Sequence, residues 1–249
     1  MLTITAIPAL QDNYIWLLQH GRHAAVVDPG EATPVLDVLR KNDLQLEAIL
    51  CTHRHRDHVC GIAELRGVYN VPVYGRSHPN NPHITHDLRE GDQLRLDLLD
   101  ITFDIIETPG HLEDHIAFIA PGMVFCGDVM FGAGCGKNFE GTLEQLHHSL
   151  QRLAALPENT LVYCAHEYTA YNLPFALACE PTNPVVQQRI AYTRIVRATV
   201  PFSIALEKLT NPFLRCSSPE LVWTLQARGL TDTSELGVFT ALRDWREHF

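Results

Sequence analysis

The residues Thr52-His53-Arg54-His55-Arg56-Asp57-His58 decide how the rest of this sequence is interpreted. They follow the apolar run at residues 48–51, which predicts a buried strand. Alternate side chains of an extended segment point the same way, so His53, His55 and Asp57 can converge while His58 follows the chain into the next element. Imidazole nitrogen and carboxylate oxygen suit zinc, iron and manganese. The stretch therefore predicts a metal site, and a solvated polar turn is the alternative.

Three later apolar runs also end at a metal-ligand residue type. Residues 101–106 lead to His111, residues 124–126 to Asp128, and residues 161–164 to His166. If these ends gather at one edge, the available donors are His53, His55, Asp57, His58, His111, Asp128 and His166. Seven donors are too many for one tetrahedral ion but suffice for two, with Asp128 bridging and a water shared between the ions.

His111 and His115 have the spacing of a helical zinc pair. Pro109 and Gly110 come just before them, and a strand-like run at residues 116–119 follows. Both features argue against a helix at this point.

Composition restricts the class of protein. The 249 residues can bury a sizeable core, and 46% hydrophobic with 19% charged residues is typical of a folded globular chain. The net charge of -10 argues against a nucleic-acid surface. No apolar run approaches the roughly 20 residues that span a bilayer, and the first residues lack the pattern of a secretion signal. The seven cysteines are odd in number and include no Cys-x-x-Cys pair, so without an export signal we expect reduced thiols and a cytoplasmic location. We also expect a monomer.

The pattern of elements predicts an α/β fold with two mixed sheets and helices outside them. Strands are expected at residues 14–18, 24–27, 48–51, 71–74, 94–98, 101–106, 116–119, 124–126 and 161–164. Helices are expected at residues 33–41, 59–66, 142–156, from 183 to about 200, 221–225 and 239–245. Thr142 with Gln145 predicts a capping box, and Asn183-Pro184 predicts a helix start.

Strand signals fade after His166, so we divide the chain into residues 1–170, the catalytic domain, and residues 171–249, a helical substrate-binding domain. Residues 189–249 hold eight Lys and Arg against six Asp and Glu, a balance of +2, whereas the preceding residues carry -12. We expect the less acidic helical part to receive an anionic part of a substrate.

Taken together, residues 52–58, Thr108-Pro109-Gly110-His111, Gly127-Asp128 and His166 resemble the metallo-β-lactamase superfamily. That resemblance implies an αβ/βα sandwich with a two-metal edge. Residues 134–141, Ala165-His166-Glu167-Tyr168, residues 211–215 and residues 242–246 are similar to the hydroxyacylglutathione hydrolase (glyoxalase II) family, with a smaller C-terminal helical domain.

The family resemblance implies hydrolysis of glutathione thioesters, chiefly S-D-lactoylglutathione to glutathione and D-lactate in methylglyoxal detoxification. It also implies two divalent ions, zinc foremost, with iron or manganese as alternatives. By position, His53, His55 and His111 would hold the first ion, Asp57, His58 and His166 the second, and Asp128 both. Glutathione contacts are implied at Lys137, Asn138, Phe139, Tyr168, Arg243 and Arg246.

Five positions depart from the family pattern. Phe139 stands where some members have Tyr, and Arg246 stands where Lys is usual. Cys60 replaces a common Gly, and Leu112 and Asp114 replace the usual Thr and Gly near His111. None of these changes removes a metal ligand, so they bear on affinity and not on the chemistry.

The reaction needs a strong nucleophile at neutral pH. Two dications lower the pKa of a shared water from about 16 toward about 7, which gives a bridging hydroxide. With Asp57, Asp128 and hydroxide counted, the site keeps a charge of about +1 for a developing oxyanion. Asp57 would also orient the nucleophile. Asp28 is expected either to accept a hydrogen bond from a ligand imidazole or to form only an Asp-Pro-Gly turn.

Other functions compete with this interpretation. Within the superfamily, an enzyme of another sulfur compound, such as a single-iron persulfide dioxygenase, is the main rival. A β-lactamase is disfavoured by the absence of an export signal, and a nuclease by the acidic balance. From a different class, the chain could be a non-catalytic metal-binding module whose helical part docks a protein partner.

Overall fold

The computed structural model describes residues 1–249, which form two compact units. The first unit comprises Met1–Thr108, Asp114–Gly127 and Tyr163–His166. The second comprises Pro109–Glu113, Asp128–Val162 and Glu167–Phe249. None of the helices has both the length and the apolar character needed to cross a membrane.

The first unit is built on a mixed six-stranded sheet with the order β1-β2-β3-β4-β5-β6. Its strands are β1 (Thr3–Ala9), β2 (Asn13–His20), β3 (His23–Val27), β4 (Gln45–Leu50), β5 (Val73–Gly75) and β6 (His86–Asp87). β1, β2 and β3 are antiparallel neighbours, whereas β3 to β6 pair in parallel. Because β3 and β4 run parallel, their carboxyl ends lie at the same edge of the sheet, where Asp28 follows β3 and the donor run follows β4.

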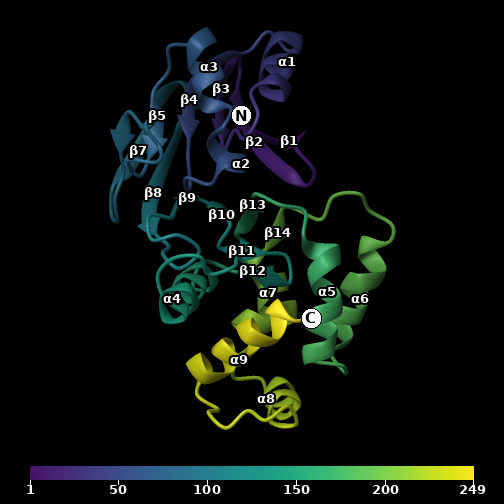
Figure 1. The fold of residues 1–249 in the computed structure, drawn as a ribbon. Coiled ribbons are helices and arrows are strands. Elements are labelled where there is room, and N and C mark those ends of the chain that lie inside the picture. Colours follow the sequence, from purple (N-terminus) through teal and green to yellow (C-terminus); the bar gives the residue numbers. More distant parts are fainter. The chain divides into compact units, whose positions relative to one another are not determined.

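Three helices belong to this sheet: α1 (Thr33–Lys41), α2 (Arg56–Val59) and α3 (Ile62–Val68). α1 and α3 lie beside β3 and β4 (Figure 1). Val35 and Leu39 of α1 and Ile62 and Leu65 of α3 are fully buried in one apolar cluster with strand residues such as Val26. Burying one such side chain stabilises the fold by about 1.5–3 kcal/mol, so this layer fixes the sheet on its helices.

A second sheet of the first unit has the order β7-β8-β9-β10, and the last residues of β13 adjoin β10. These strands are β7 (Gln93–Leu96), β8 (Ile101–Glu107), β9 (Ile116–Ala120), β10 (Met123–Gly127) and β13 (Leu161–Cys164), with the short helix η1 (Asp97–Leu99) after β7. Trp16 of β2 packs edge-on against Tyr163 of β13, with ring centroids 4.9 Å apart, and Tyr163 stacks on Phe125 of β10 at 5.0 Å. The two sheets therefore share an aromatic core.

The second unit is mainly helical. Its helices are α4 (Leu143–Ala154), α5 (Thr169–Cys179), α6 (Pro184–Thr193), α7 (Ile204–Thr210), η2 (Pro212–Leu214), α8 (Pro219–Gln226) and α9 (Glu235–Glu247). Short strands complete it: β11 (Met130–Phe131) pairs with β12 (Gly134–Cys135), and β14 (Phe202–Ser203) pairs with the first residues of β13. Phe175, Phe213 and Phe239 are fully buried and join α5, η2 and α9.

Both predicted helix starts are confirmed. The Thr142 hydroxyl accepts from the Gln145 backbone N–H, and the Gln145 side chain accepts from that of Thr142, which completes a capping box. Asn183 Oδ1 accepts from the N–H groups of Val185 and Val186 at the start of α6.

The helix predicted at residues 59–66 is wrong in detail, because α2 and α3 are separate. Gly61 lies between them and donates its N–H to the Pro29 carbonyl at 2.9 Å. A Cβ at Gly61 would come within 3.0 Å of the backbone of Pro29 and Glu31. The helix is therefore interrupted at Gly61, where the backbone packs closely against residues 29–31.

The helix predicted from residue 183 to about 200 ends earlier, at Thr193. Thr199 donates its backbone N–H to the Glu167 carboxylate at 2.8 Å, and its hydroxyl bonds to the same group. Val200 precedes Pro201, a position that disfavours helical dihedrals. The segment around Thr199 is therefore held out of the helix by Glu167, a residue 32 positions earlier in the sequence. The division of the chain at residue 170 stays a prediction.

A buried ion pair in the second unit gives a test of its stability. Glu180 is only 2% exposed, and Arg215 binds both of its oxygens, at 2.6 and 2.9 Å. Burial raises the pKa of Glu180, but the bonds from Arg215 and Ser218 lower it more, so the pKa lies below its ordinary value of 4.5. The stabilisation is thus complete above pH 4.5 and is lost as the pH falls through the lowered pKa.

We expect Glu180→Gln to cost about 1.5–3 kcal/mol of unfolding free energy at pH 7. The difference from the parent protein should shrink at acid pH, because protonation also neutralises the parent carboxylate. Urea unfolding at pH 7, 5, 4 and 3 measures it. A difference that stays constant or grows toward pH 3 would contradict this account.

Candidate metal centre and substrate pocket

Asp28 anchors the donor run. It follows β3, is 4% exposed, and has a positive φ of 52°. Its Oδ1 accepts from the Thr52 N–H at 2.7 Å, and its Oδ2 accepts from the Thr52 hydroxyl at 2.6 Å and from His58 Nδ1 at 3.1 Å. Gly30 also donates to the Asp28 carbonyl, so the Asp-Pro-Gly turn and the imidazole contact are both present.

Asp57, His58 and His166 form a compact donor group within the first unit. Their donor atoms all lie within 4.8 Å of one another. The Nε2 atoms of His58 and His166 each lie 3.4 Å from Asp57 Oδ2. Nδ1 of His166 bonds to Asp12 Oδ1 at 2.7 Å. Because carboxylates only accept, Nδ1 donates in both rings and Nε2 keeps a lone pair directed at the group.

His53 and His55 approach each other in the same unit. The Thr52 hydroxyl gives its proton to Asp28, so its oxygen accepts from His53 Nδ1, 3.0 Å away. His53 Nε2 lies 3.2 Å from His55 Nδ1. Two ring nitrogens that face each other at this distance suit a shared cation between them.

His111 and Asp128 form the donor pair of the second unit. His111 Nδ1 donates to the Lys137 carbonyl at 2.8 Å, which leaves Nε2 3.6 Å from Asp128 Oδ2. Both residues are buried. The segment from His111 to His115 is not a helix, which agrees with the prediction. His115 Nδ1 lies 2.9 Å from the Thr108 hydroxyl, with which it forms a hydrogen bond.

The protonation of Asp57 fits a metal ligand. Burial raises the pKa of Asp57, but the neighbouring His166 and His58 side chains and the bond from Asn13 lower it more, so the pKa lies well below the ordinary value of 3.8. Asp57 is therefore ionised at neutral pH. With the five imidazoles and Asp128, the chain supplies a set of His and Asp donors compatible with a binuclear metal site.

Four of the six predicted glutathione contacts line one pocket of the second unit. Lys137, Tyr168, Arg243 and Arg246 surround a cavity of about 300 Å³, which Glu247 also lines. Lys137 and Asn138 line a neighbouring cavity of about 490 Å³. The positive charges of Lys137, Arg243 and Arg246 suit an anionic ligand.

Asn138 and Phe139 lie on the same segment as Lys137 but have other contacts. The Asn138 amide donates to the carbonyls of Gly110 and Glu140, at 2.5 and 2.9 Å. Phe139 is 58% exposed, and its ring packs edge-on against His111 at 5.3 Å. Asn138 thus holds the loop that carries Lys137 against the His111 turn.

Glu247 is a feature that the sequence analysis missed. Its carboxylate binds Lys137 Nζ at 2.7 Å and Arg243 Nη2 at 2.6 Å. The bond from Lys137 is the largest cause of the lowered pKa of Glu247. An internal anion therefore contacts two of the cations that we assign to the substrate.

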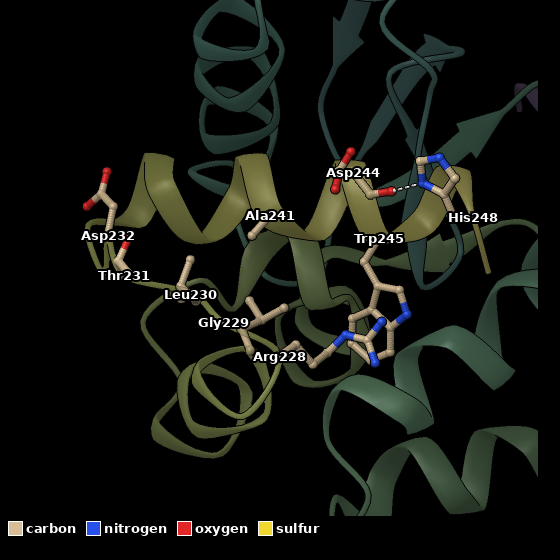
Figure 2. Close-up of a pocket in the computed structure, with 10 residues that line it drawn as sticks. Arg228, Gly229, Leu230, Thr231, Asp232, Ala241, Asp244, Trp245 and His248 are labelled. Atoms are coloured by element: carbon tan, nitrogen blue, oxygen red, sulfur yellow. Dashed lines mark hydrogen bonds between the residues drawn. The ribbon is translucent and has the colours of Figure 1, made fainter.

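Another pocket of the second unit, of about 400 Å³, has a different charge (Figure 2). It is lined by one guanidinium, Arg228, and by two carboxylates, Asp232 and Asp244. Arg228 lies over the Trp245 ring, 3.9 Å from its centroid. This balance is less suited to an anion than that of the pocket around Lys137.

Comparison with known proteins identifies the family. Residues 10–166 match the model of the metallo-beta-lactamase superfamily, and residues 167–249 match that of the hydroxyacylglutathione hydrolase C-terminus. The hydroxyacylglutathione hydrolase of Aliivibrio fischeri is 46% identical over 255 residues, which cover 100% of both chains. The chain belongs to the hydroxyacylglutathione hydrolase family.

Solved structures agree with this assignment. ETHE1 from Myxococcus xanthus is 26% identical with a TM-score of 0.66, and the match covers 98% of each chain. TTHA1623 in a di-iron-bound form is 27% identical with a TM-score of 0.61, and the match covers 85% of this chain and 100% of that one. The predicted fold class, two sheets flanked by helices with a helical C-terminal region, is confirmed.

The positions that depart from the family pattern are accommodated locally. Cys60 has a helical φ of −62°, and its side chain is exposed. Leu112 is buried. Asp114 forms an ion pair with Arg54 at 2.5 Å. Arg246 lies over the Tyr171 ring, 4.5 Å from its centroid, a contact that a planar guanidinium favours.

Sequence reasoning also missed the residues that orient the site. Asp12 and Thr52 each contact an imidazole of the candidate donor set, but an isolated Asp or Thr gives no periodic signal. Asn211 was noticed only through the family resemblance. Its amide donates to the carbonyls of Phe131 at 3.3 Å and Gly134 at 2.8 Å, and so holds the turn that leads into Lys137.

Two glycines test whether the donor backbones must stay in place. A Cβ on Gly30 would come under 3.0 Å from the Asp57 carbonyl, and one on Gly136 equally close to that of Asp128. We expect Gly30→Ala and Gly136→Ala each to lower zinc affinity by about tenfold or more, because the carboxylates must move.

The control is Gly67→Ala, since a Cβ there has nothing within 4 Å and the position is helical. This variant should bind zinc normally and be as stable as the parent or slightly more so. Zinc titration of metal-depleted protein against a coloured chelator provides the measurement. Unchanged affinity in both site variants would show that the donor positions tolerate displacement.

Proposed function

We propose that the protein hydrolyses glutathione thioesters, chiefly S-D-lactoylglutathione to glutathione and D-lactate. Full-length identity of 46% to a hydroxyacylglutathione hydrolase carries this proposal. The C-terminal family match supports it further, because it extends the likeness beyond the superfamily fold to the helical region with the cationic pocket. No observation favours a dioxygenase or a non-catalytic module. A cytoplasmic location and a monomeric state stay predictions.

We infer that two divalent ions occupy the donor set, zinc foremost, with iron or manganese as alternatives. His53, His55 and His111 are assigned to one ion, Asp57, His58 and His166 to the other, and Asp128 to both. The Nδ1 bonds of His58, His166 and His111 to oxygen acceptors support this, because a ring that donates from Nδ1 carries its lone pair on Nε2, the nitrogen that can coordinate a metal ion. The di-iron-bound form of TTHA1623 is consistent with a binuclear centre.

When bound, two such ions lower the pKa of a shared water and polarise the thioester carbonyl. The residues of the chain orient the reactants. Asn13 donates to Asp57 Oδ2 at 3.1 Å and steadies the carboxylate that we assign to directing the attacking water.

The substrate's glutathione part has two carboxylates and one ammonium, so it is a net anion. The protein carries -10 overall and must therefore attract this anion locally. We assign Lys137, Arg243 and Arg246 to the carboxylates, with Tyr168 at the side of the same pocket. Glu247 competes for Lys137 and Arg243, and its carboxylate occupies a position on these cations that an incoming carboxylate would take.

The activity itself is tested with S-D-lactoylglutathione by following loss of thioester absorbance. We expect turnover without oxygen, its loss on chelation, and its return with Zn²⁺. Asp128→Asn should lose a metal ion and nearly all turnover, whereas Asp104→Asn, an exposed change on β8, should retain both. Turnover that persists in metal-free protein, or that needs oxygen, would refute the proposal.

The binding assignment predicts opposite effects of two substitutions. Lys137→Gln should raise KM by about tenfold with little change in kcat, because a charge-assisted contact remote from the reacting bond is lost. Glu247→Gln should lower KM, because the competing carboxylate is gone. Lys208→Gln, also a partly exposed lysine of the second unit, is the control. Steady-state kinetics decides the assignment, and a KM that rises in both site variants would show that Glu247 assists binding.

A further inference from the structure

Arg54 occupies an unusual position in the donor run. It stands between His53 and His55, the two imidazoles whose ring nitrogens approach to 3.2 Å. A guanidinium keeps its proton at any physiological pH. A permanent positive charge is therefore built into the segment that must attract dications, where Coulomb repulsion opposes metal binding.

A second segment of the first unit runs antiparallel to this one. Ile116 donates its N–H to the Thr52 carbonyl at 2.9 Å. The His115 ring stacks on the His53 ring, with centroids 4.7 Å apart and planes 21° apart. Asp114 Oδ1 accepts from Arg54 Nη1 at 2.5 Å. Three successive contacts thus match residues 52, 53 and 54 with residues 116, 115 and 114.

The last of these contacts is well shielded from solvent. The Arg54 and Asp114 side chains are 10% and 12% exposed, whereas those of Arg22 and Asp43, another Arg–Asp pair of the first unit, are 73% and 83% exposed. Solvent screens the exposed pair, but it screens the Arg54–Asp114 pair much less. Asp114 also stands at a position that departs from the family pattern, so it needs a local explanation.

We propose that Asp114 is a positioning residue of the metal centre, which neutralises Arg54 and clamps the His53–His55 segment against residues 114–116. The pair cancels the charge of Arg54, the shielded cation beside His53 and His55, whereas Arg56, the other cation of the run, is exposed and screened by solvent. His115 supports the clamp through its stack on His53 and its bond to Thr108. This inference rests on the proposed metal ligands, and its test separates the two.

The sign of the charge gives the test. Asp114→Asn leaves a shielded guanidinium without its counter-charge, so we expect zinc affinity to fall about 10- to 100-fold. Arg54→Gln leaves a carboxylate, which does not repel cations, so affinity should fall less than about threefold or rise. The double variant Arg54→Gln/Asp114→Asn should recover most of the affinity, because it contains no unpaired charge. A purely structural pair would give equal losses in the two single variants.

Full-length, metal-depleted proteins are titrated with Zn²⁺ against a coloured chelator, and thermal unfolding of each metal-depleted protein is recorded in parallel. Asp43→Asn, in the exposed Arg22–Asp43 pair, is the matched control and should keep the parent affinity. Parent protein that binds no zinc would refute the proposed function. A parent that binds zinc, with equal losses in both single variants or with none in Asp114→Asn, would overturn this inference alone.

If Asp114→Asn does not fold, Arg54→Gln decides the question by itself. The proposal requires its zinc affinity to fall by less than about threefold or to rise, even where its melting temperature is lower. A tenfold loss of affinity in Arg54→Gln would overturn it.

Discussion

The donor run of the first unit depends on one buried carboxylate. Asp28 accepts three hydrogen bonds, two from Thr52 and one from His58, and so joins the end of β3 to the segment that follows β4. An ionised group in the interior needs such partners, since an unpaired one would be costly. The requirement works in both directions. The donor run satisfies Asp28, and Asp28 fixes the direction of two imidazoles, directly at His58 and through the Thr52 hydroxyl at His53.

The same principle extends to the other imidazoles. His166 and His111 each donate from Nδ1 to an oxygen supplied by a different part of the chain, Asp12 and the Lys137 carbonyl. Fixing one nitrogen of a ring also fixes its tautomer and the direction of the other nitrogen. The rings assigned as ligands are therefore oriented by the chain itself, which would lower the entropy lost on binding an ion. Lys137 takes part in both arrangements. Its carbonyl oxygen orients His111, and its ammonium group lines the cationic pocket.

Charge is balanced locally in both units. An acidic protein that binds an anion needs a cationic pocket, and the second unit places Lys137, Arg243 and Arg246 around one. Glu247 neutralises part of that charge. Asp114 has the corresponding relation to Arg54 in the donor run. In each case a carboxylate offsets a cation placed close to a binding site, at Arg54 with little solvent screening and at Lys137 with more.

The sequence by itself determined the class of fold, most strands and helices, and the identity of the candidate donors. Hydrophobic period and strand-end residue types are local properties, and β4, α1 and the capping box of α4 follow from them. It did not give β1, an edge strand that contains Pro8, nor the short pair β11 and β12, whose two residues each show no period. It also placed the end of α6 wrongly, because Glu167 holds Thr199 from outside the helix. Only the tertiary structure decided which groups orient each imidazole and which carboxylate offsets each cation. Asp12 and His166, like Glu247 and Lys137, lie more than a hundred residues apart, and Asp114 lies 60 residues from Arg54, so folding alone brings these groups together.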